Sequence, residues 1–223
     1  MTHTIAFVGG TGPEGRGLAT RFALAGHRVI IGSRQAARGA AAAVAVADSV
    51  PRGRAAISGT TNAEAVAAAE IVVITVPYEG HAATLELLRD ALAGKTVIDA
   101  VVPVRFDRGP RPVAVAAGSA SEEAAELLPD SCVVGAFHTL PAQLLLDPTR
   151  AIDGDVLVTG DDAAAKQLVC ALAEQIDGVR AVDAGPLRFS RFVEQITLLL
   201  IGINGRHDAH TGIRIAGLPG GDR

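Results

Sequence analysis

Three glycines near the start of the chain have a spacing that suits dinucleotide binding. Gly10, Gly12 and Gly15 follow the pattern G-x-G-x-x-G, directly after the apolar run 5–8 and before a helical stretch. In such sites the first glycine makes a tight turn, the second lets the backbone approach a pyrophosphate, and the third lets helix and strand pack closely. The helix start adds free N–H groups for the phosphates. An ordinary turn is the alternative, but the position between a predicted strand and a predicted helix favours the dinucleotide site.

The residues after the second predicted strand, 28–31, indicate which dinucleotide binds. An NAD site usually has an Asp or Glu about 20 residues after the glycine loop, where it binds the ribose 2′-OH. This chain has Ser33 and Arg34 there, with Arg38 one helical turn further on. A hydroxyl and two guanidinium groups suit a 2′-phosphate, and no carboxylate is present to repel it. The sequence therefore predicts NADP.

Four segments at the ends of predicted strands are expected to surround the ligands. They cover residues 10–15, 76–81, 101–103 and 138–142. Ligands of open α/β sheets bind outside the carboxyl ends of the strands. Each segment has Gly or Pro with small apolar residues, which suits two stacked flat rings better than polar catalysis.

His138 is the one titratable residue that the sequence places at a strand end inside this cleft. Its ring could contact a substrate or a substrate carbonyl, or it could be hydrogen-bonded for packing alone. A short-chain dehydrogenase requires a tyrosine with a lysine four residues later. Tyr78 is the only tyrosine of this chain, and no lysine stands four residues after it. The two lysines, Lys95 and Lys166, are expected outside the cleft. Direct hydride exchange between two cofactors needs no acid–base residue, and the protein then supplies alignment.

Apolar runs alternate with helical stretches along the chain, which predicts a parallel, doubly wound sheet. We expect an α/β fold of Rossmann type, with a mostly parallel sheet and a smaller C-terminal α/β subdomain. Residues 1–137 would form the NADP-binding domain, and residues 138–223 would complete the cleft within one compact unit. Residues 105–118, rich in Pro, Gly and Arg, are predicted to form a loop. The predicted strands cover 5–8, 28–31, 55–58, 71–76, 96–100, 132–137, 155–159 and 181–183.

A final helix is predicted to begin at Gly185-Pro186. Its apolar residues have helical spacing, which predicts packing against the core rather than a partner-binding face. They are Phe189, Phe192, Val193, Ile196, Leu199, Leu200 and Ile203. We expect a homodimer formed through this helix, and a frayed tail after Leu218.

Composition excludes several classes of function. The net charge is −4 without a basic block, so neither nucleic acid nor an anionic membrane is expected as a partner. The longest apolar run, 198–203, is too short to span a bilayer, and the first strand starts too early for a signal peptide. Cys132 and Cys170 are expected to be buried in a reducing cytoplasm. His207 and His210 lack a third ligand, so we expect no metal.

Three separated motifs resemble the NADPH-dependent coenzyme F420 reductases (F420H2:NADP oxidoreductases), from about residue 5 to 218. The motifs are Gly9-Gly10-Thr11-Gly12 with Gly32-Ser33-Arg34, then His138-Thr139-Leu140-Pro141-Ala142, and Asp183-Ala184-Gly185-Pro186-Leu187 with Ser190-Arg191. The resemblance implies reversible hydride transfer between the nicotinamide of NADP(H) and the deazaflavin of F420. Composition and spacing alone do not distinguish a deazaflavin from a flavin.

The resemblance also assigns residues to the two cofactors. It implies that NADP is held by Thr11, Gly12, Pro13, Glu14, Ser33, Arg34 and Arg38. Val76 and the turn Val101-Val102-Pro103 would lie along the nicotinamide. The deazaflavin would contact His138, Leu140, Pro141 and Ala142, and the region 203–212 would close over it. Pro13-Glu14 departs from the family, where Asn followed by an apolar residue is common, so the phosphate contacts there stay open.

Two other classes of function remain as alternatives. An NADP-dependent reductase of a small imine or carbonyl would need a proton donor in the cleft. A non-catalytic NADP-binding redox sensor is the other, because GGTG loops also occur in redox-sensing regulators. The family further resembles the cytoplasmic domain of membrane ferric reductases.

Overall fold

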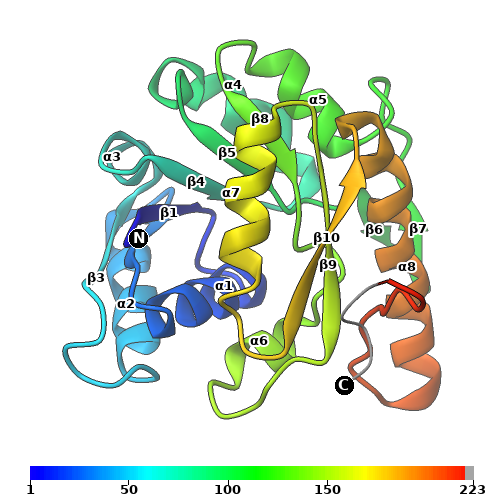
Figure 1. The fold of residues 1–223 in the computed structure, drawn as a ribbon. Coiled ribbons are helices and arrows are strands. Elements are labelled where there is room, and N and C mark those ends of the chain that lie inside the picture. The colour runs from blue at the N-terminus through cyan, green and yellow to red at the C-terminus, as the bar shows by residue number, and fades with distance from the viewer. Residues whose placement is uncertain (219–223) are drawn as a thin grey trace.

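A single sheet organises the computed structural model, which describes residues 1–218. Eight strands of this part of the chain have the order β10-β9-β8-β5-β4-β1-β2-β3 (Figure 1). All neighbours are parallel except β8 and β9, which pair antiparallel. The strands are β1 (Thr4–Val8), β2 (Arg28–Ser33), β3 (Ile57–Thr61), β4 (Ile71–Ile74), β5 (Thr96–Asp99), β8 (Cys132–Gly135), β9 (Gly154–Gly160) and β10 (Val179–Gly185). The predicted doubly wound, mostly parallel α/β sheet is confirmed.

Helices cover both faces of the sheet because its central strand is apolar on both sides. Ile5 and Phe7 of β1 pack in one layer, and Ala6 and Val8 pack in the other. The first layer receives α1, α2 and α7, and the second receives α3, α4 and α5 (Figure 1). The helices are α1 (Pro13–Leu24), α2 (Ala36–Ala47), α3 (Asn62–Ala67), α4 (His81–Leu92), α5 (Ala120–Leu127), α6 (Ala142–Leu146), α7 (Ala163–Ala173) and α8 (Ser190–His207). Within residues 1–218, none of them is both long and apolar enough to cross a lipid bilayer.

The strand order creates a crevice beside β1. From β1 the chain proceeds to β2 and β3 on one side, and then returns to β4, β5 and β8 on the other. At such a switch of direction, the connections leave the carboxyl ends of the two central strands toward opposite faces, which opens a crevice between them. The segments that follow β1, β4, β5 and β8 meet here.

Arg21 joins α1 to α6, which follows the predicted ring-contact segment 138–142. Its guanidinium is buried and donates to three backbone carbonyls, those of Leu144 (2.5 Å), Leu145 (3.1 Å) and Asp147 (2.6 Å). Carbonyl groups at the end of a short helix lack partners within that helix. Arg21 satisfies them and fixes α6 against the far part of α1.

The prediction of a loop over residues 105–118 is wrong for its first part. Here β6 (Val104–Phe106) and β7 (Pro110–Pro112) form an antiparallel hairpin. Arg108 and Gly109 make its turn, both with positive φ (51° and 128°). The prolines hide this pairing from a sequence pattern, because proline lacks the N–H that a strand needs on its bonded side.

The predicted core stripe on the last helix is only half buried. Val193 and Leu200 are buried, but Phe192 and Leu199 are 62% and 65% exposed, and Phe189 is 39% exposed. A short 3-10 turn, Leu187–Phe189, precedes α8, so the helix begins later than predicted. It lies at one edge of the fold beside β7 and α5, where the molecule covers only one of its faces (Figure 1).

The two cysteines differ in exposure. Cys170 on α7 is half-buried, whereas Cys132 is exposed, so the prediction that both are buried is wrong. Cys132 is the first residue of β8, where the chain enters the sheet from solvent. The predicted frayed tail after Leu218 lies outside the described residues.

Candidate active site

A cleft of about 1050 Å³ opens at the carboxyl ends of the central strands. Six parts of the chain contribute to its walls: the glycine loop, the end of β2, the segments after β4, β5 and β8, and the inner face of α8. The β6–β7 hairpin and residues after α8 add to its rim. The lining residues are Gly9, 11–14, Ser33, Arg34, Arg38, Asn62, 75–80, Thr84, 100–102, Val104, Phe106, 138–143, Thr197, Leu200, Ile201, Asn204, His210 and Thr211.

The three glycines of the predicted motif have different places in the loop. Gly10 donates its N–H to the carbonyls of Phe7 (3.2 Å) and Gly32 (3.1 Å), and a Cβ on Gly15 would lie 2.6 Å from the Cα of Gly10. These two glycines therefore shape the loop and do not line the cleft. Gly12 does line it, and a Cβ there would meet no atom within 4 Å.

The start of α1 faces the cleft with open backbone groups. Gly12 is the N-cap residue and offers no side chain to the first amides, and Pro13 follows in the first turn. The first N–H groups of a helix have no partner within it, and they carry partial positive charge. Thr11 completes this rim. The residues fit the phosphates of a dinucleotide, because a Cβ-free N-cap leaves room for a ligand atom.

The three residues predicted to select NADP lie together at the rim. Ser33 ends β2 and is buried, and Arg34 and Arg38 are exposed above it. All three line the cleft. Within residues 1–218, neither guanidinium makes a hydrogen bond or ion pair, which leaves their donors available to an anion.

Glu14 adds a carboxyl group to the first turn of α1. Its Oε1 atom is buried, and the described residues provide it with no hydrogen-bond partner. Burial raises the pKa of this carboxyl to about 8. Near pH 7 the group is therefore mostly neutral, and it would not repel an anion bound at the helix start.

His138 lies in the cleft wall as a buried, neutral ring. Burial lowers its pKa to about 4, although the charge of Asp99 acts in the opposite direction. Its Nδ1 and Nε2 atoms have no hydrogen-bond partner among the described residues. Both nitrogens are themselves buried, so the atoms of His138 that face the cleft are not its hydrogen-bonding atoms. Phe137, with a φ of 69°, turns the chain here after β8.

The remaining predicted residues are divided between cleft and interior. Val76 and Val102 line the cleft, as do Leu140, Pro141 and Ala142. Pro103 does not, because it faces a separate shallow depression near Arg191. The turn after β5 therefore contributes its first residues, 100–102.

Sequence reasoning missed Asn62 and Thr197 of the cleft, and it did not predict the contacts of Asn204 and Thr211 within the expected region 203–212. Asn62, at the start of α3, accepts the N–H of Gly9 (3.2 Å) and so fixes the glycine loop. Thr197 of α8 donates to the carbonyl of His138 (2.9 Å). Asn204 accepts from Thr211 through both the backbone N–H (2.8 Å) and the hydroxyl (2.6 Å), which folds the chain after α8 back over the cleft. No spacing signal connects these positions, because packing brings them together.

The predicted region 203–212 contributes Asn204, His210 and Thr211 to this wall. His207 is not among the lining residues. In the described part of the chain, no three His, Cys, Asp or Glu side chains gather as the ligands of a metal would.

Comparisons with known proteins find relatives whose names include NADP, the dinucleotide for which the residues of the cleft are suited. The family described as "NADP oxidoreductase coenzyme F420-dependent" matches residues 4–103. A protein of Methanothermobacter marburgensis named F420-dependent NADP reductase is 44% identical, over 96% of this chain and 99% of its own length. A protein of Methanocaldococcus jannaschii with the same name is 40% identical, over 96% and 98%.

A solved structure extends this similarity to three dimensions. A putative F420-dependent NADP reductase from Arthrobacter sp. FB24 superposes with a TM-score of 0.81 at 30% identity, covering 97% of this chain and all of that one. The resemblance found in the sequence motifs is thus confirmed. Because the similarity extends over almost the full length of these relatives, the chain belongs to the family of F420-dependent NADP reductases.

Proposed function

We propose that this protein catalyses reversible hydride transfer between NADP(H) and the deazaflavin coenzyme F420. The observation that carries the proposal is a cleft with the open start of α1 and two exposed arginines at one end, and an apolar wall at the other. It agrees with the names of the relatives that match almost the full chain. When both are bound, the two rings supply the chemistry, in which a hydride moves between the nicotinamide C4 and the deazaflavin C5.

The N-terminal residues hold NADP in this proposal. Backbone amides at the start of α1 bind the pyrophosphate, with Thr11, Gly12, Pro13 and Glu14 around it. Ser33, Arg34 and Arg38 bind the 2′-phosphate. Gly10 and Gly15 act indirectly, since they give the loop its shape.

The opposite wall positions the two rings. Val76 and Val102 lie along the nicotinamide, and Pro103 supports the turn from behind. His138, Leu140, Pro141 and Ala142 contact the deazaflavin. These side chains are apolar or neutral, so they exclude water from the two rings. The alignment of the rings by this wall then accelerates hydride transfer. The ring nitrogens of His138 are buried in this structure, so a hydrogen bond to a ring carbonyl requires the imidazole to turn toward the cleft. Because the ring is neutral near pH 7, it is a poor proton donor.

The proposal includes three further expectations. Residues 1–137 form the NADP-binding part and residues 138–223 complete the F420 side. The protein acts in the cytoplasm. It is a homodimer through α8, where Phe189, Phe192 and Leu199 leave apolar surface exposed.

Mixing the purified protein with NADPH and F420 tests the reaction. We expect rapid loss of NADPH absorbance with F420, and little with FMN or with NADH as donor. Tight NADPH binding without turnover of any acceptor would favour a redox sensor instead. Oxidation only with a small imine or carbonyl would favour the other alternative.

Replacing both rim arginines tests the NADP assignment. Charge-assisted hydrogen bonds contribute about 1.5–3 kcal/mol each, so the loss of one from each arginine in Arg34→Ala with Arg38→Ala is expected to weaken NADPH binding by about 100- to 10,000-fold. NADH binding should change little, because NADH has no 2′-phosphate. The matched control is Arg52→Ala with Arg89→Ala, two exposed arginines outside the cleft. Equal NADPH affinity in both double variants contradicts the assignment.

The role of His138 is tested by His138→Leu, which keeps apolar bulk and removes both nitrogens. Loss of one neutral hydrogen bond corresponds to about 0.5–1.5 kcal/mol, so we expect the KM for F420 to rise up to about tenfold, with the KM for NADPH unchanged. The lowered pKa of His138 means that its ring gains charge only as the pH falls toward 4. The wild-type KM for F420 should therefore show no histidine inflection between about pH 5 and 8. An inflection at about 6.5 that vanishes in the variant rejects the buried, neutral state of His138, and an unchanged KM for F420 in the variant rejects its assignment as a deazaflavin contact.

Sedimentation velocity tests the dimer. We expect the wild-type protein to sediment as a dimer and Phe192→Glu as a monomer, because a buried carboxylate at the contact would be costly. Leu87→Glu on α4 is the control, since Leu87 is also exposed (83%) but lies away from α8. A wild-type monomer, or a Phe192→Glu dimer, argues against this interface.

A further inference from the structure

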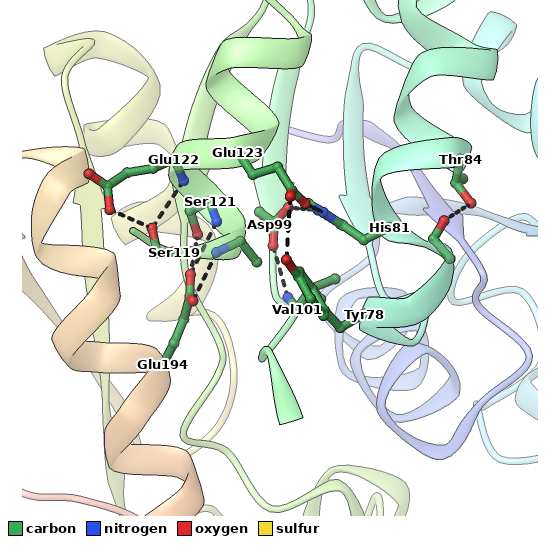
Figure 2. Close-up of polar contacts among 12 residues, drawn as sticks. Tyr78, His81, Thr84, Asp99, Val101, Ser119, Ser121, Glu122, Glu123 and Glu194 are labelled. Carbon is green, nitrogen blue, oxygen red and sulfur yellow. Dashed lines mark hydrogen bonds and ion pairs between the residues drawn. The ribbon is translucent and has the colours of Figure 1, made fainter. Parts of the chain in front are cut away.

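A chain of hydrogen bonds runs through the interior behind the cleft (Figure 2). At its centre is His81, the first residue of α4, which has no exposed surface. Its Nε2 lies 2.7 Å from Oδ2 of Asp99, and its Nδ1 lies 2.8 Å from Oε2 of Glu123. When both carboxyl groups are ionised their oxygens only accept hydrogen bonds, so both ring nitrogens donate and the ring is an imidazolium.

The electrostatics agree with this protonation state. Burial alone would lower the pKa of His81, but the charges and hydrogen bonds of Asp99 and Glu123 raise it to about 9. Burial and the charge of Asp99 raise the pKa of nearby Glu194 to about 8, so this carboxyl is mostly neutral at pH 7. Since His138 is neutral as well, His81 supplies the positive charge beside Asp99.

Both ends of this chain of hydrogen bonds reach the cleft wall. Asp99, the last residue of β5, also accepts the backbone N–H of Val101 through Oδ1 (2.9 Å). A bond from an Asp side chain to the backbone two residues later bends the chain into a turn. At the other end, the hydroxyl of Tyr78 donates to Oε1 of Glu123 (3.3 Å), and its ring stacks on His81 at 6.0 Å. Tyr78 and Val101 both line the cleft.

We propose that His81, Asp99 and Glu123 are positioning residues that hold two neighbouring walls of the cleft in register. One wall is the segment after β4, which contains Tyr78, and the other is the turn after β5. None of the three proposed residues lines the cleft, so they act through the backbone and through Tyr78. The inference rests on the proposed function, because the turn after β5 is where the nicotinamide is expected.

The ion pairs of His81 with Asp99 and Glu123 are better suited to fixing the positions of these elements than to stabilising the folded state. A buried ion pair costs much of its attraction in lost hydration, and it is therefore weak support for the folded state by itself. Its hydrogen bonds do fix relative positions, here between β5, α4 and α5. An apolar contact would allow these elements to slide, whereas two bonds from one planar ring permit one arrangement.

The single tyrosine provides a readout that is independent of turnover. The chain has one Tyr and no Trp, so tyrosinate absorbance reports Tyr78 alone. Burial raises the pKa of Tyr78, and the charge and hydrogen bond of Glu123 raise it further. Glu123→Gln is expected to lower this pKa toward its ordinary value.

The control for this titration is Glu122→Gln on the same helix. Glu122→Gln also removes an ion pair, the one between Glu122 and Arg191 (2.6 Å), but Glu122 has no contact with Tyr78 or His81. We expect the Tyr78 titration to be unchanged in this control. An unchanged titration in Glu123→Gln, or an equal shift in both variants, overturns the proposal.

Kinetics with NADPH and F420 test the positioning itself. A displacement of about 1 Å can cost on the order of 100-fold in rate, so Asp99→Asn is expected to lower kcat between about 10- and 100-fold. The KM for NADPH should stay within about threefold, because the phosphate contacts lie elsewhere. Glu122→Gln should retain the wild-type kcat.

The outcomes separate this inference from the proposed function. If the wild-type protein does not reduce F420, the proposed function fails, while the Tyr78 titration still decides whether the network exists. If Asp99→Asn does not fold, Glu123→Gln takes its place in the kinetic test, since Glu123 is partly exposed (24%). A wild-type kcat in every folded variant of the network overturns the positioning role.

Discussion

Burial of β1 on both faces is the constraint on which the rest of this molecule depends. Residues 5–8 have no exposed surface, and successive side chains point into opposite layers. Each large apolar side chain buried in this way contributes about 1.5–3 kcal/mol. Helices must therefore cover both faces, and the chain must leave β1 in one direction and return on its other side. The cleft is the geometric result of that return.

Charge is distributed across the cleft according to depth. Exposed guanidinium groups lie at the rim, where water offsets the cost of a charge that has no protein partner. Deeper, the titratable groups are neutral near pH 7: burial lowers the pKa of His138 and raises that of Glu14. The buried imidazolium of His81, behind the cleft, is enclosed by two carboxylates. The proposed ring-binding wall is thus free of buried charge, while the arginines proposed to bind an anion lie at its edge.

The sequence predicted features that depend on local order. The glycine spacing, the missing acid at position 34 and the continuous apolar strands each follow from neighbouring residues, and the sheet confirms the last of these. The β6–β7 hairpin was missed because its prolines oppose strand propensity. The exposure of Phe192 was missed because helical periodicity shows that a stripe exists, but not how much of it another element covers.

The hydrogen bonds among His81, Asp99 and Glu123 could not be predicted from the sequence at all. His81 reads as an ordinary helix start, and Asp99 as the polar end of an apolar run. Their contact requires the packing of α4 against β5, and the contact with Glu123 requires α5 as well. No fixed spacing joins residues from three elements, so only three-dimensional proximity reveals them.

The three carbonyl contacts of Arg21 have a consequence for how ligands leave. One end of α1 faces the cleft, where the phosphates are proposed to bind, and further along the same helix Arg21 holds α6, next to segment 138–142. With the proposed assignment, the two ligand sites are thus joined through α1, and the Arg21 contacts oppose a hinge motion that would separate them. On this proposal, product release depends on smaller parts at the rim of the cleft, which are the β6–β7 hairpin and the segment after α8. One ligand could then be exchanged while the binding site of the other keeps its geometry.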